Sequence, residues 1–434
     1  MPGKNPQTAS AKLASISLFV LAVILTQPAQ AQTFTVLYNF TGGADGSTPK
    51  TGLSMDGAGN LYGTTYTGGE TGNNCAINFL TTSGCGTVFR LAHSGSGWTF
   101  DSLYKFTGRS DGAPPSSRVV FGPDGALYGT ATYGGDASCN PGFYGCGLVY
   151  RLNPQPTFCR NVLCPWVQTS AFTFQHYPSQ GQFPSGDLIF DAQGNLYGTT
   201  IFGGNNSCGD GEGCGTVFEL TRSGGSWAES VLYAFTIPLA YPSWGVIADH
   251  SGNLYGNLTG YGGGFDGAVF QLTPSGSGWT ENTLYEFDNN QDGHDVQAGL
   301  VIDQQGYLVG GTEYGGQSNF GTIFQLNPLP NGTWNLNTIY NFQLAAGGPE
   351  ANLTMDSAGN LYGTAYSDGA HAFGSVFKLT PTDQGWVYTD FHDFNRSDGA
   401  NPISSVLVDA QGNLYGTTSA GGAYGYGLVW EITP

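Results

Sequence analysis

The stretch GNLYGTT at Gly194–Thr200 recurs along this chain and decides its fold. Near-copies stand at Gly59–Thr65, Gly125–Ala131, Gly252–Leu258, Gly306–Thr312, Gly359–Ala365 and Gly412–Thr418. Self-similarity at a regular interval is typical of repeat architectures, in which each copy is one supersecondary unit. The copies therefore represent either a repeated site or a repeated structural unit, and the residues between them distinguish the two.

Each interval between copies holds four strand-like segments. The first is a short apolar run ending in Asp, such as Gly52–Asp56, and the second is the repeated stretch itself. The third reads GTVFxL with variants, at Gly86–Leu91, Gly147–Leu152, Gly215–Leu220, Gly267–Leu272, Gly321–Leu326, Gly374–Leu379 and Gly427–Ile432. The fourth follows a Trp and ends in LYxF or a looser copy, at Leu103–Phe106, Ala171–Phe174, Leu232–Phe235, Leu284–Phe287, Ile339–Phe342 and Phe391–Phe394. Short runs with a period of two predict β-strands.

One displaced strand predicts that the repeats close into a ring. A fourth segment, Thr35–Phe40, precedes every first segment, and the last third segment ends shortly before Pro434. The N-terminal strand 33–40 is therefore expected to complete the last unit, which leaves no open sheet edge. We predict an all-β fold, a seven-bladed β-propeller with four antiparallel strands per blade over residues 32–434. A β-solenoid is the alternative, but it favours shorter, more uniform repeats with caps and does not explain the displaced strand.

A recurrent turn, DxxGN, precedes the second strand of most blades. It stands at Asp56–Asn60, Asp191–Asn195, Asp249–Asn253, Asp356–Asn360 and Asp409–Asn413. Asp and Asn side chains bond nearby backbone, and Gly supplies the positive φ of a tight hairpin. A calcium or catalytic role for the Asp is the alternative, but a residue needed once for chemistry need not recur in most blades. The turn role is therefore favoured, and the Gly of LYG is expected to permit a close backbone approach.

The first 31 residues have the layout of a secretory signal peptide. Lys4 and Lys12 precede the apolar run Leu13–Thr26, and small residues follow at Ala29–Ala31. The run is shorter than the roughly 20 residues that span a bilayer, although a retained membrane anchor is the alternative. We predict cleavage after Ala31, no later membrane span, and a periplasmic or secreted protein. Loss of the two lysines with the signal peptide changes the formal net charge from −19 to −21. A protein this negatively charged is a poor partner for nucleic acid and for anionic membranes.

Eight cysteines form four close pairs in the sequence. An even count, local spacing and an export signal favour disulfides, and nearest-neighbour pairing is the simplest choice. The expected pairs are Cys75–Cys85, Cys139–Cys146, Cys159–Cys164 and Cys208–Cys214. A metal site is the alternative, but no pair has zinc-knuckle spacing and the six histidines are scattered. We therefore expect no metal and no cofactor.

The repeat resembles a known family. GNLYGTTxxGG followed by GTVFxL and LYxF, over nearly the whole chain after residue 31, is similar to the GloVer (Gloeobacter/Verrucomicrobia) tandem repeat of exported choice-of-anchor proteins. The resemblance implies an exported, propeller-like protein. Many members end in an anchor segment, whereas this chain ends on a propeller strand, so release rather than anchoring is expected. The turn is also similar to that of NHL-type and streptogramin lyase propellers, and no catalytic residue is carried over from them.

Sequence variation concentrates on one face of the predicted ring, which the strand 2–3 and strand 4–1 loops form. An aromatic residue follows the motif in six blades: Tyr66, Tyr133, Phe202, Tyr261, Tyr314 and Tyr366. Strand 4–1 loops carry DG-type turns with Asp45, Asp111, Asp292 and Asp398. These side chains offer flat surfaces and hydrogen-bond acceptors for a sugar. Because the feature repeats, structural plugs under each Gly-Gly loop are the competing interpretation.

Candidate catalytic residues are few. His176, His294 and His371 are expected on or near the variable face, where Glu313 and Glu350 could join them, and a His/Glu pair there could abstract a proton or activate water. Their spacing matches no motif, and neither a G-x-S-x-G elbow, nor an HExxH helix, nor a Walker loop is present. The sequence therefore favours a non-enzymatic protein.

Three functions follow as hypotheses. The first is an exported, monomeric binding propeller with a ligand, such as a glycan or a protein, on the variable face. The second is an extracellular lyase or hydrolase that acts on carbohydrate or on a cyclic ester. The third is a structural cell-surface repeat protein.

Overall fold

The computed structural model describes residue 3 and residues 32–70, 75, 83–95, 97–139, 145–154, 166–175, 179–204, 212–236, 240–260, 267–276, 278–288, 291–343 and 348–434. The chain divides into two units, Met1–Ala31 and Gln32–Pro434, and the following paragraphs concern the second. The predicted signal peptide lies almost entirely outside the described residues. A search of the described residues for helices long and apolar enough to span a membrane found none.

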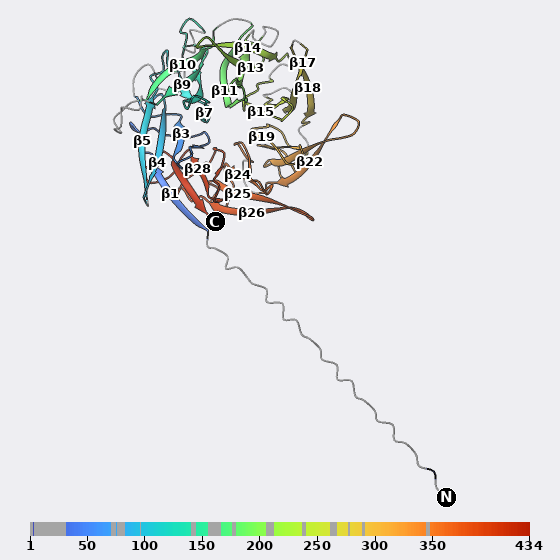
Figure 1. Cartoon of the computed structure of the whole chain (residues 1–434). Coiled ribbons are helices and arrows are strands. Elements are labelled where there is room, and N and C mark those ends of the chain that lie inside the picture. Colours follow the sequence, from blue (N-terminus) through green and yellow to red (C-terminus); the bar gives the residue numbers. More distant parts are fainter. Residues whose placement is uncertain are drawn as a thin grey trace. The chain divides into compact units, whose positions relative to one another are not determined.

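Gln32–Pro434 forms a ring of seven antiparallel sheets around a central channel, as the repeat predicts (Figure 1). Blades 1 to 3 contain these strands, each sheet running outward from the channel: β2 (Ser54–Met55), β3 (Leu61–Thr65), β4 (Thr87–Ser94) and β5 (Gly97–Lys105); β6 (Ala113–Pro115), β7 (Val120–Phe121), β8 (Leu127–Tyr133), β9 (Leu148–Asn153) and β10 (Val167–Thr173); β11 (Gly181–Phe190), β12 (Leu196–Gly203), β13 (Thr216–Ser223) and β14 (Ser226–Ala234). Blade 2 differs from the prediction, because its first strand is split into β6 and β7, which both pair with β8.

The other four blades keep four strands each. They contain β15 (Val246–Ala248), β16 (Leu254–Leu258), β17 (Ala268–Ser275) and β18 (Gly278–Glu286); β19 (Ala298–Ile302), β20 (Leu308–Thr312), β21 (Thr322–Pro328) and β22 (Trp334–Asn341); β23 (Thr354–Met355), β24 (Leu361–Ala365), β25 (Ser375–Thr382) and β26 (Gly385–Asp393); and β27 (Leu407–Val408), β28 (Leu414–Thr418), β29 (Leu428–Thr433) and β1 (Thr33–Asn39).

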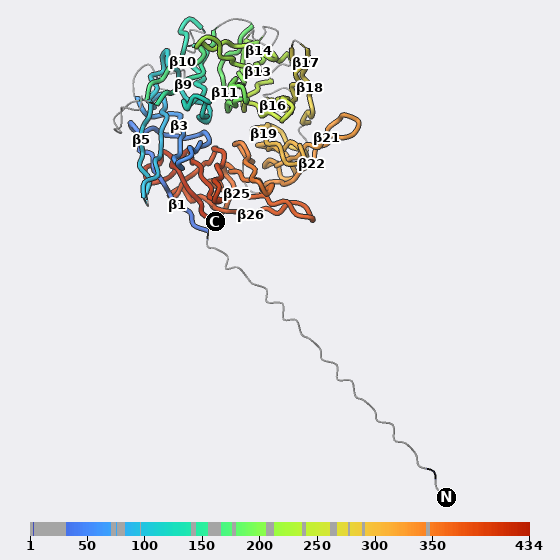
Figure 2. The backbone as a smooth tube through the Cα atoms, in the orientation of Figure 1, coloured from blue at the N-terminus to red at the C-terminus, as the bar shows by residue number. Residues whose placement is uncertain are grey.

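The ring closes as the displaced strand predicts. β1 is the outer strand of blade 7 and pairs antiparallel with β29, with Thr33 opposite Thr433 and Asn39 opposite Leu428. Figure 2 shows the blue N-terminal strand beside the red end of the chain. Both ends of the repeat array are thereby held in one sheet.

The glycine of LYG accommodates an aromatic ring. A Cβ added to Gly63 would lie 2.5 Å from Cζ of Phe89, and one added to Gly198 would lie 2.7 Å from Cζ of Phe218. These phenylalanines come from the facing position of the third strand and are fully buried. The close approach is therefore made by a side chain, whereas the sequence suggested backbone.

The repeated turn forms as predicted. Asp249 Oδ1 accepts hydrogen bonds from the backbone N–H groups of Ser251 and Asn253, at 2.8 and 2.9 Å. Its Oδ2 accepts from Asn253 Nδ2 and from the hydroxyl of Tyr255, at 2.7 and 3.1 Å. Burial alone would raise the pKa of Asp249, but these hydrogen bonds lower it overall. The Asp thus ties the turn to the Tyr of the second strand.

Adjacent residues of the second strand pack on opposite sides of each blade. Leu61 lies in a buried cluster with Tyr415 and Val429 of blade 7. Tyr62 lies in another cluster with Val119 and Leu127 of blade 2. Because neighbouring side chains in a strand face opposite sides, one motif fills both interfaces of its blade.

Candidate functional site

The channel is lined by equivalent residues of the seven blades. The upper ring takes one residue from each strand 4–1 loop. In six blades it is the residue after the loop Pro, and in blade 5 it is the residue after Val296. Its members are Lys50, Ser116, Ser185, Ser243, Gln297, Glu350 and Ile403. The lower ring stands two residues further on: Gly52, Arg118, Asp187, Gly245, Gly299, Asn352 and Ser405. The backbone supports this alignment, since Thr48, Tyr241, Asp295 and Asn401, each two residues before the upper ring, all accept from the residue after the second strand.

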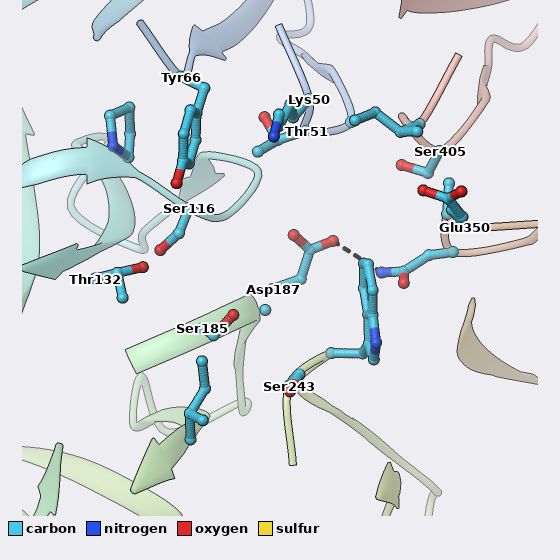
Figure 3. Close-up of a pocket in the computed structure, with 18 of the residues that line it drawn as sticks. Lys50, Thr51, Tyr66, Ser116, Thr132, Ser185, Asp187, Ser243, Glu350 and Ser405 are labelled. Carbon is cyan, nitrogen blue, oxygen red and sulfur yellow. Dashed lines mark hydrogen bonds between the residues drawn. The ribbon is translucent and has the colours of Figure 1, made fainter. Parts of the chain in front are cut away.

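A cavity of about 430 Å³ opens among these rings. Six of the seven upper-ring residues line this cavity. Five of these six are polar or charged, and the sixth is Ile403. The aromatic residues Tyr66, Tyr133 and Trp244 also contribute to its wall. Figure 3 shows the labelled side chains around one space, with Asp187 between them. Because Tyr66 and Tyr133 follow or end second strands, the cavity lies at the end of the channel that carries the strand 2–3 and strand 4–1 loops.

A hydrogen-bonded network forms the floor of this cavity. Asp187 accepts from the backbone N–H of Arg118 at 2.9 Å and pairs with its Nε at 3.3 Å. It also accepts from Asn352 Nδ2 at 3.2 Å, the dashed line at Asp187 in Figure 3. Asn352 Oδ1 in turn accepts from the N–H of Gly299 at 2.9 Å. Below this network a smaller cavity of about 160 Å³ shares Asp187, Asn352 and Ser405 with the upper one. Blades 2, 3, 5 and 6 are therefore joined across the channel.

Two ionisable side chains of the upper ring perturb each other. The pKa of Glu350 is raised to about 7, mainly by burial and to a smaller extent by Glu313, while Lys50 opposes the increase. Lys50 is exposed at the cavity wall. Partial loss of hydration beside the protein still lowers its pKa, and the negative charge of Glu350 opposes that decrease. The Lys50 Nζ lies 4.3 Å from the centroid of the Tyr66 ring, a cation–π geometry.

Blade 5 brings together two of the predicted catalytic candidates. His294 stacks on Tyr314 with ring centroids 5.6 Å apart, and its Nδ1 lies 3.6 Å from an oxygen of Asp295. Burial raises the pKa of Glu313, with smaller opposing contributions from Tyr314 and His294. The negative charge of Glu313 also raises the pKa of Glu350, which lines the cavity, so the blade 5 cluster influences the cavity through its charge. His371 is exposed and lines neither cavity, and His176 lies outside the described residues.

The five described members of the predicted aromatic set fall into two registers. Tyr66 and Tyr366 stand six residues into their copies of the LYG strand, whereas Tyr133, Phe202 and Tyr314 stand seven residues in. Of the described members of this set, only Tyr66 and Tyr133 line the cavity. Phe202 packs edge-to-face on Phe183 and Tyr241, Tyr314 is 37% exposed on the His294 ring, and Tyr366 is half-buried. Tyr261 lies outside the described residues.

The predicted acidic residues hold their own loops. Asp45 accepts from the Tyr38 hydroxyl and from the N–H and hydroxyl of Thr41, at 2.6 to 3.0 Å. Asp111 makes the equivalent contacts with Tyr104 and Thr107. Asp292 accepts from the Tyr285 hydroxyl at 2.7 Å, and Asp398 accepts from Asn395 and lies 3.2 Å from Nε2 of His392. None of the four lines the cavity.

Disulfides occur at the variable face. Cys75 is bonded to Cys85 and Cys139 to Cys146, which are two of the expected pairs. Cys214 is also disulfide-bonded. Cys159, Cys164 and Cys208 lie outside the described residues. Within the described parts of the chain, no group of three or more His, Cys, Asp and Glu side chains is placed to hold a metal ion.

Sequence reasoning missed the two channel rings. The predicted site comprised the aromatic residues after the second strand and the Asp residues of the strand 4–1 loops, whereas the cavity is lined mainly by residues between those Asp turns and the end of the first strand. A signal for the upper ring existed, because the position after the loop Pro holds Lys, Ser, Gln, Glu and Ile in otherwise similar repeats. The first strands are often only two or three residues long, so their alternation was too short to show which residues face the channel.

Comparison with known proteins identifies the repeat. The profile of the Gloeobacter/Verrucomicrobia repeat matches three overlapping stretches, residues 26–237, 138–354 and 245–434. No curated protein matches the chain in sequence.

Solved structures are similar at low sequence identity. A polysaccharide lyase, an ulvan lyase bound to -[GlcA(1-4)Rha3S]-, is 10% identical with a TM-score of 0.49, over 89% of this chain and 94% of that one. A candidate 6-phosphogluconolactonase from Bacteroides uniformis is 13% identical with a TM-score of 0.48, over 79% and 84%. A protein from Lactobacillus plantarum is 12% identical with a TM-score of 0.47, over 79% and 83%. Likeness at this level says nothing about the activity of this chain.

Proposed function

This chain belongs to the Gloeobacter/Verrucomicrobia repeat family, and on that premise we propose that it is an exported binding protein that takes a carbohydrate into the cavity at the mouth of its channel. The cavity is the observation that carries the proposal. Its volume of about 430 Å³ lies within the roughly 300–1,000 Å³ of small-molecule sites. Such sites combine aromatic or apolar walls with a few convergent polar groups.

The composition of the wall supports a sugar as the ligand. Hydroxyl groups of Ser116, Ser185 and Ser243 come from three successive blades at one level of the channel. Tyr66 and Tyr133 add aromatic surface beside them. A sugar presents hydroxyls at its rim and C–H groups on its faces, and it requires both kinds of partner. Of the aromatic residues predicted on the variable face, the proposed ligand set therefore retains Tyr66 and Tyr133.

Glycan binding by the chain from Gln32 to Pro434 tests the proposal. The protein is screened on a glycan array, and hits are titrated by calorimetry. We expect Tyr66→Ala to weaken binding by about 10-fold through lost aromatic contact. Tyr424→Ala is the control, because Tyr424 is 61% exposed and lies outside the cavity lining. An array with no hits, or equal losses for Tyr66→Ala and Tyr424→Ala, contradicts the proposal.

A second candidate function is hydrolase or lyase chemistry on the same ligand. The observation that favours it is the pKa of about 7 of Glu350, which suits a general acid or base near neutral pH. Incubating array hits with the protein and analysing the products by mass spectrometry tests it. Cleavage that Glu350→Gln abolishes would establish this function, and intact ligand in the presence of measurable binding leaves the binding role alone.

A further inference from the structure

We propose that the ligand carries a carboxylate, as a uronic acid does, and that Lys50 binds it. The inference rests on the proposed function, because it specifies the sugar class that the same cavity takes. Among the described residues that line the upper cavity, Lys50 is the only lysine or arginine. It forms no ion pair within 4.0 Å among the described residues. Lys50 is exposed at the cavity wall, and an ammonium without an ion-pair partner there can bind an incoming carboxylate through charge-assisted hydrogen bonds.

The contacts of Lys50 leave one side of its ammonium available. Its Nζ lies over the ring of Tyr66 at 4.3 Å, and the cation–π contact holds the side chain at the cavity wall. Water reaches Lys50 through the cavity. A ligand carboxylate could therefore approach the ammonium without displacing a protein partner.

Neither acidic side chain of the described cavity lining, Asp187 or Glu350, forms an ion pair with Lys50 that would block a ligand carboxylate. The negative charge of Asp187 is matched by Arg118 at 3.3 Å and by the amide of Asn352 at 3.2 Å. Glu350 acts on Lys50 but forms no ion pair with it. A protonated Glu350 adds no negative charge and can donate to the ligand. The upper ring then offers one cation, one acid and the three serine hydroxyls, which matches the groups of a single uronic acid.

The charge of the whole chain limits the length of this ligand. A formal charge of −19 repels a long polyanion before it reaches the channel. The repulsion between surface charges is screened beyond about 8–10 Å, so it acts little on a short ligand inside the cavity. We therefore infer a short acidic oligosaccharide, or the end of a longer one, as the occupant.

Paired sugars that differ only in the carboxylate test the inference. The chain from Gln32 to Pro434 is titrated with disaccharides ending in glucuronic, galacturonic or mannuronic acid, and with the same disaccharides ending in glucose, galactose or mannose. At least one acid is expected to bind at least ~10-fold more tightly than its neutral partner. Lys50→Met should remove this preference and Lys50→Arg should retain part of it. Lys378→Met is the matched control, because Lys378 also lies over a tyrosine, Tyr362, but outside the cavity.

The outcomes separate the two proposals. Neutral sugars that bind as tightly as the acids, with Tyr66→Ala still weakening binding, overturn the carboxylate inference and leave the carbohydrate site standing. An acid preference that survives Lys50→Met also overturns the inference. If no carbohydrate binds at all, the proposed function and the inference both fail. Circular dichroism of each variant verifies that a loss of binding does not reflect a loss of fold.

Discussion

Glu350 is the residue through which pH should control the site. Its pKa of about 7 means that it gains charge as the pH rises through neutrality. The charged groups that act on it or share its cavity are Lys50, Glu313 and Asp187, and Asp187 is paired with Arg118. Ionised Glu350 repels an acidic ligand and competes for Lys50, whereas protonated Glu350 does neither.

We therefore predict that affinity for an acidic sugar falls by about 10-fold between pH 6 and pH 8. Glu350→Gln should hold the affinity near its pH 6 value across this range. Calorimetric titrations at four pH values measure both. A decline that persists in Glu350→Gln would assign the pH dependence to Lys50 or to Glu313 instead.

A glycine of the repeated stretch offers a test of packing at a single residue. A Cβ at Gly63 would lie 2.5 Å from Phe89 and 2.8 Å from Leu53, both of which are buried. We predict that Gly63→Ala lowers the free energy of unfolding by about 1–3 kcal/mol, the usual cost of overpacking a core. Gly57→Ala is the control, because nothing lies within 4 Å of the added Cβ. Urea unfolding of both variants makes the comparison, and equal stabilities would contradict the packing argument.

At the scale of the element, the DxxGN turn depends on one carboxylate. Asp249 accepts four hydrogen bonds, two of them from backbone N–H groups. We predict that Asp249→Ala destabilises the protein by about 1–3 kcal/mol, because it leaves these donors without their acceptor. Asp383→Ala, in an exposed hairpin, should change the stability little. Thermal or urea unfolding measures the difference.

The same turns determine how stability responds to acid. The folded-state pKa values of Asp56, Asp249 and Asp356 are lowered, with burial opposing the hydrogen bonds that cause the decrease. A lowered folded pKa contributes stability above the ordinary pKa of about 4, and that contribution is lost as the pH falls through the folded value. Asp249→Asn, which keeps an oxygen acceptor but does not titrate, should reduce the loss of stability below pH 4. An unchanged acid unfolding curve would show that the turn does not contribute to it.

The elements predicted from the sequence are those with repeated residue types. Val, Phe and Leu recur in the third strand, and Asp, Gly and Asn recur in the turn, so seven copies supported the strand and five supported the turn. The split of the blade 2 first strand into β6 and β7 has no such support, since the sequence Ala-Pro-Pro of β6 occurs once in the chain. Tyr66 and Tyr133 reached the predicted set as aromatics, although they occupy different registers. Lys50 did not, and Glu350 was named only as a companion of the candidate histidines, because strand pairing is needed to show that the varied position after the loop Pro faces the channel.

At the scale of the whole molecule, the closure of the ring depends on β1. Thr33 lies opposite Thr433, and Phe40 is fully buried. Deleting residues 33–40 should therefore prevent cooperative folding, because β29 would become an open edge.

Returning the same segment to the other end should restore the fold. A circular permutant with residues 33–40 placed after Pro434, joined by a two-residue turn like that between Ser223 and Ser226, should melt within a few degrees of the parent chain. Calorimetric melting compares the three forms. A permutant as unstable as the deletion would show that chain order, and not strand pairing, holds the ring.

Each blade contributes one side chain to the upper ring. These side chains vary from blade to blade, whereas the blades keep a common backbone. Exchange of Lys50, Glu350 or one of the serines changes the cavity wall but leaves the turns, the buried aromatic rings and the strand pairing unaltered. Descendants of one ancestral chain can therefore diverge in what they bind by single codon changes at seven known places. An alignment of relatives at those seven columns would sort them by ligand before any of them is purified.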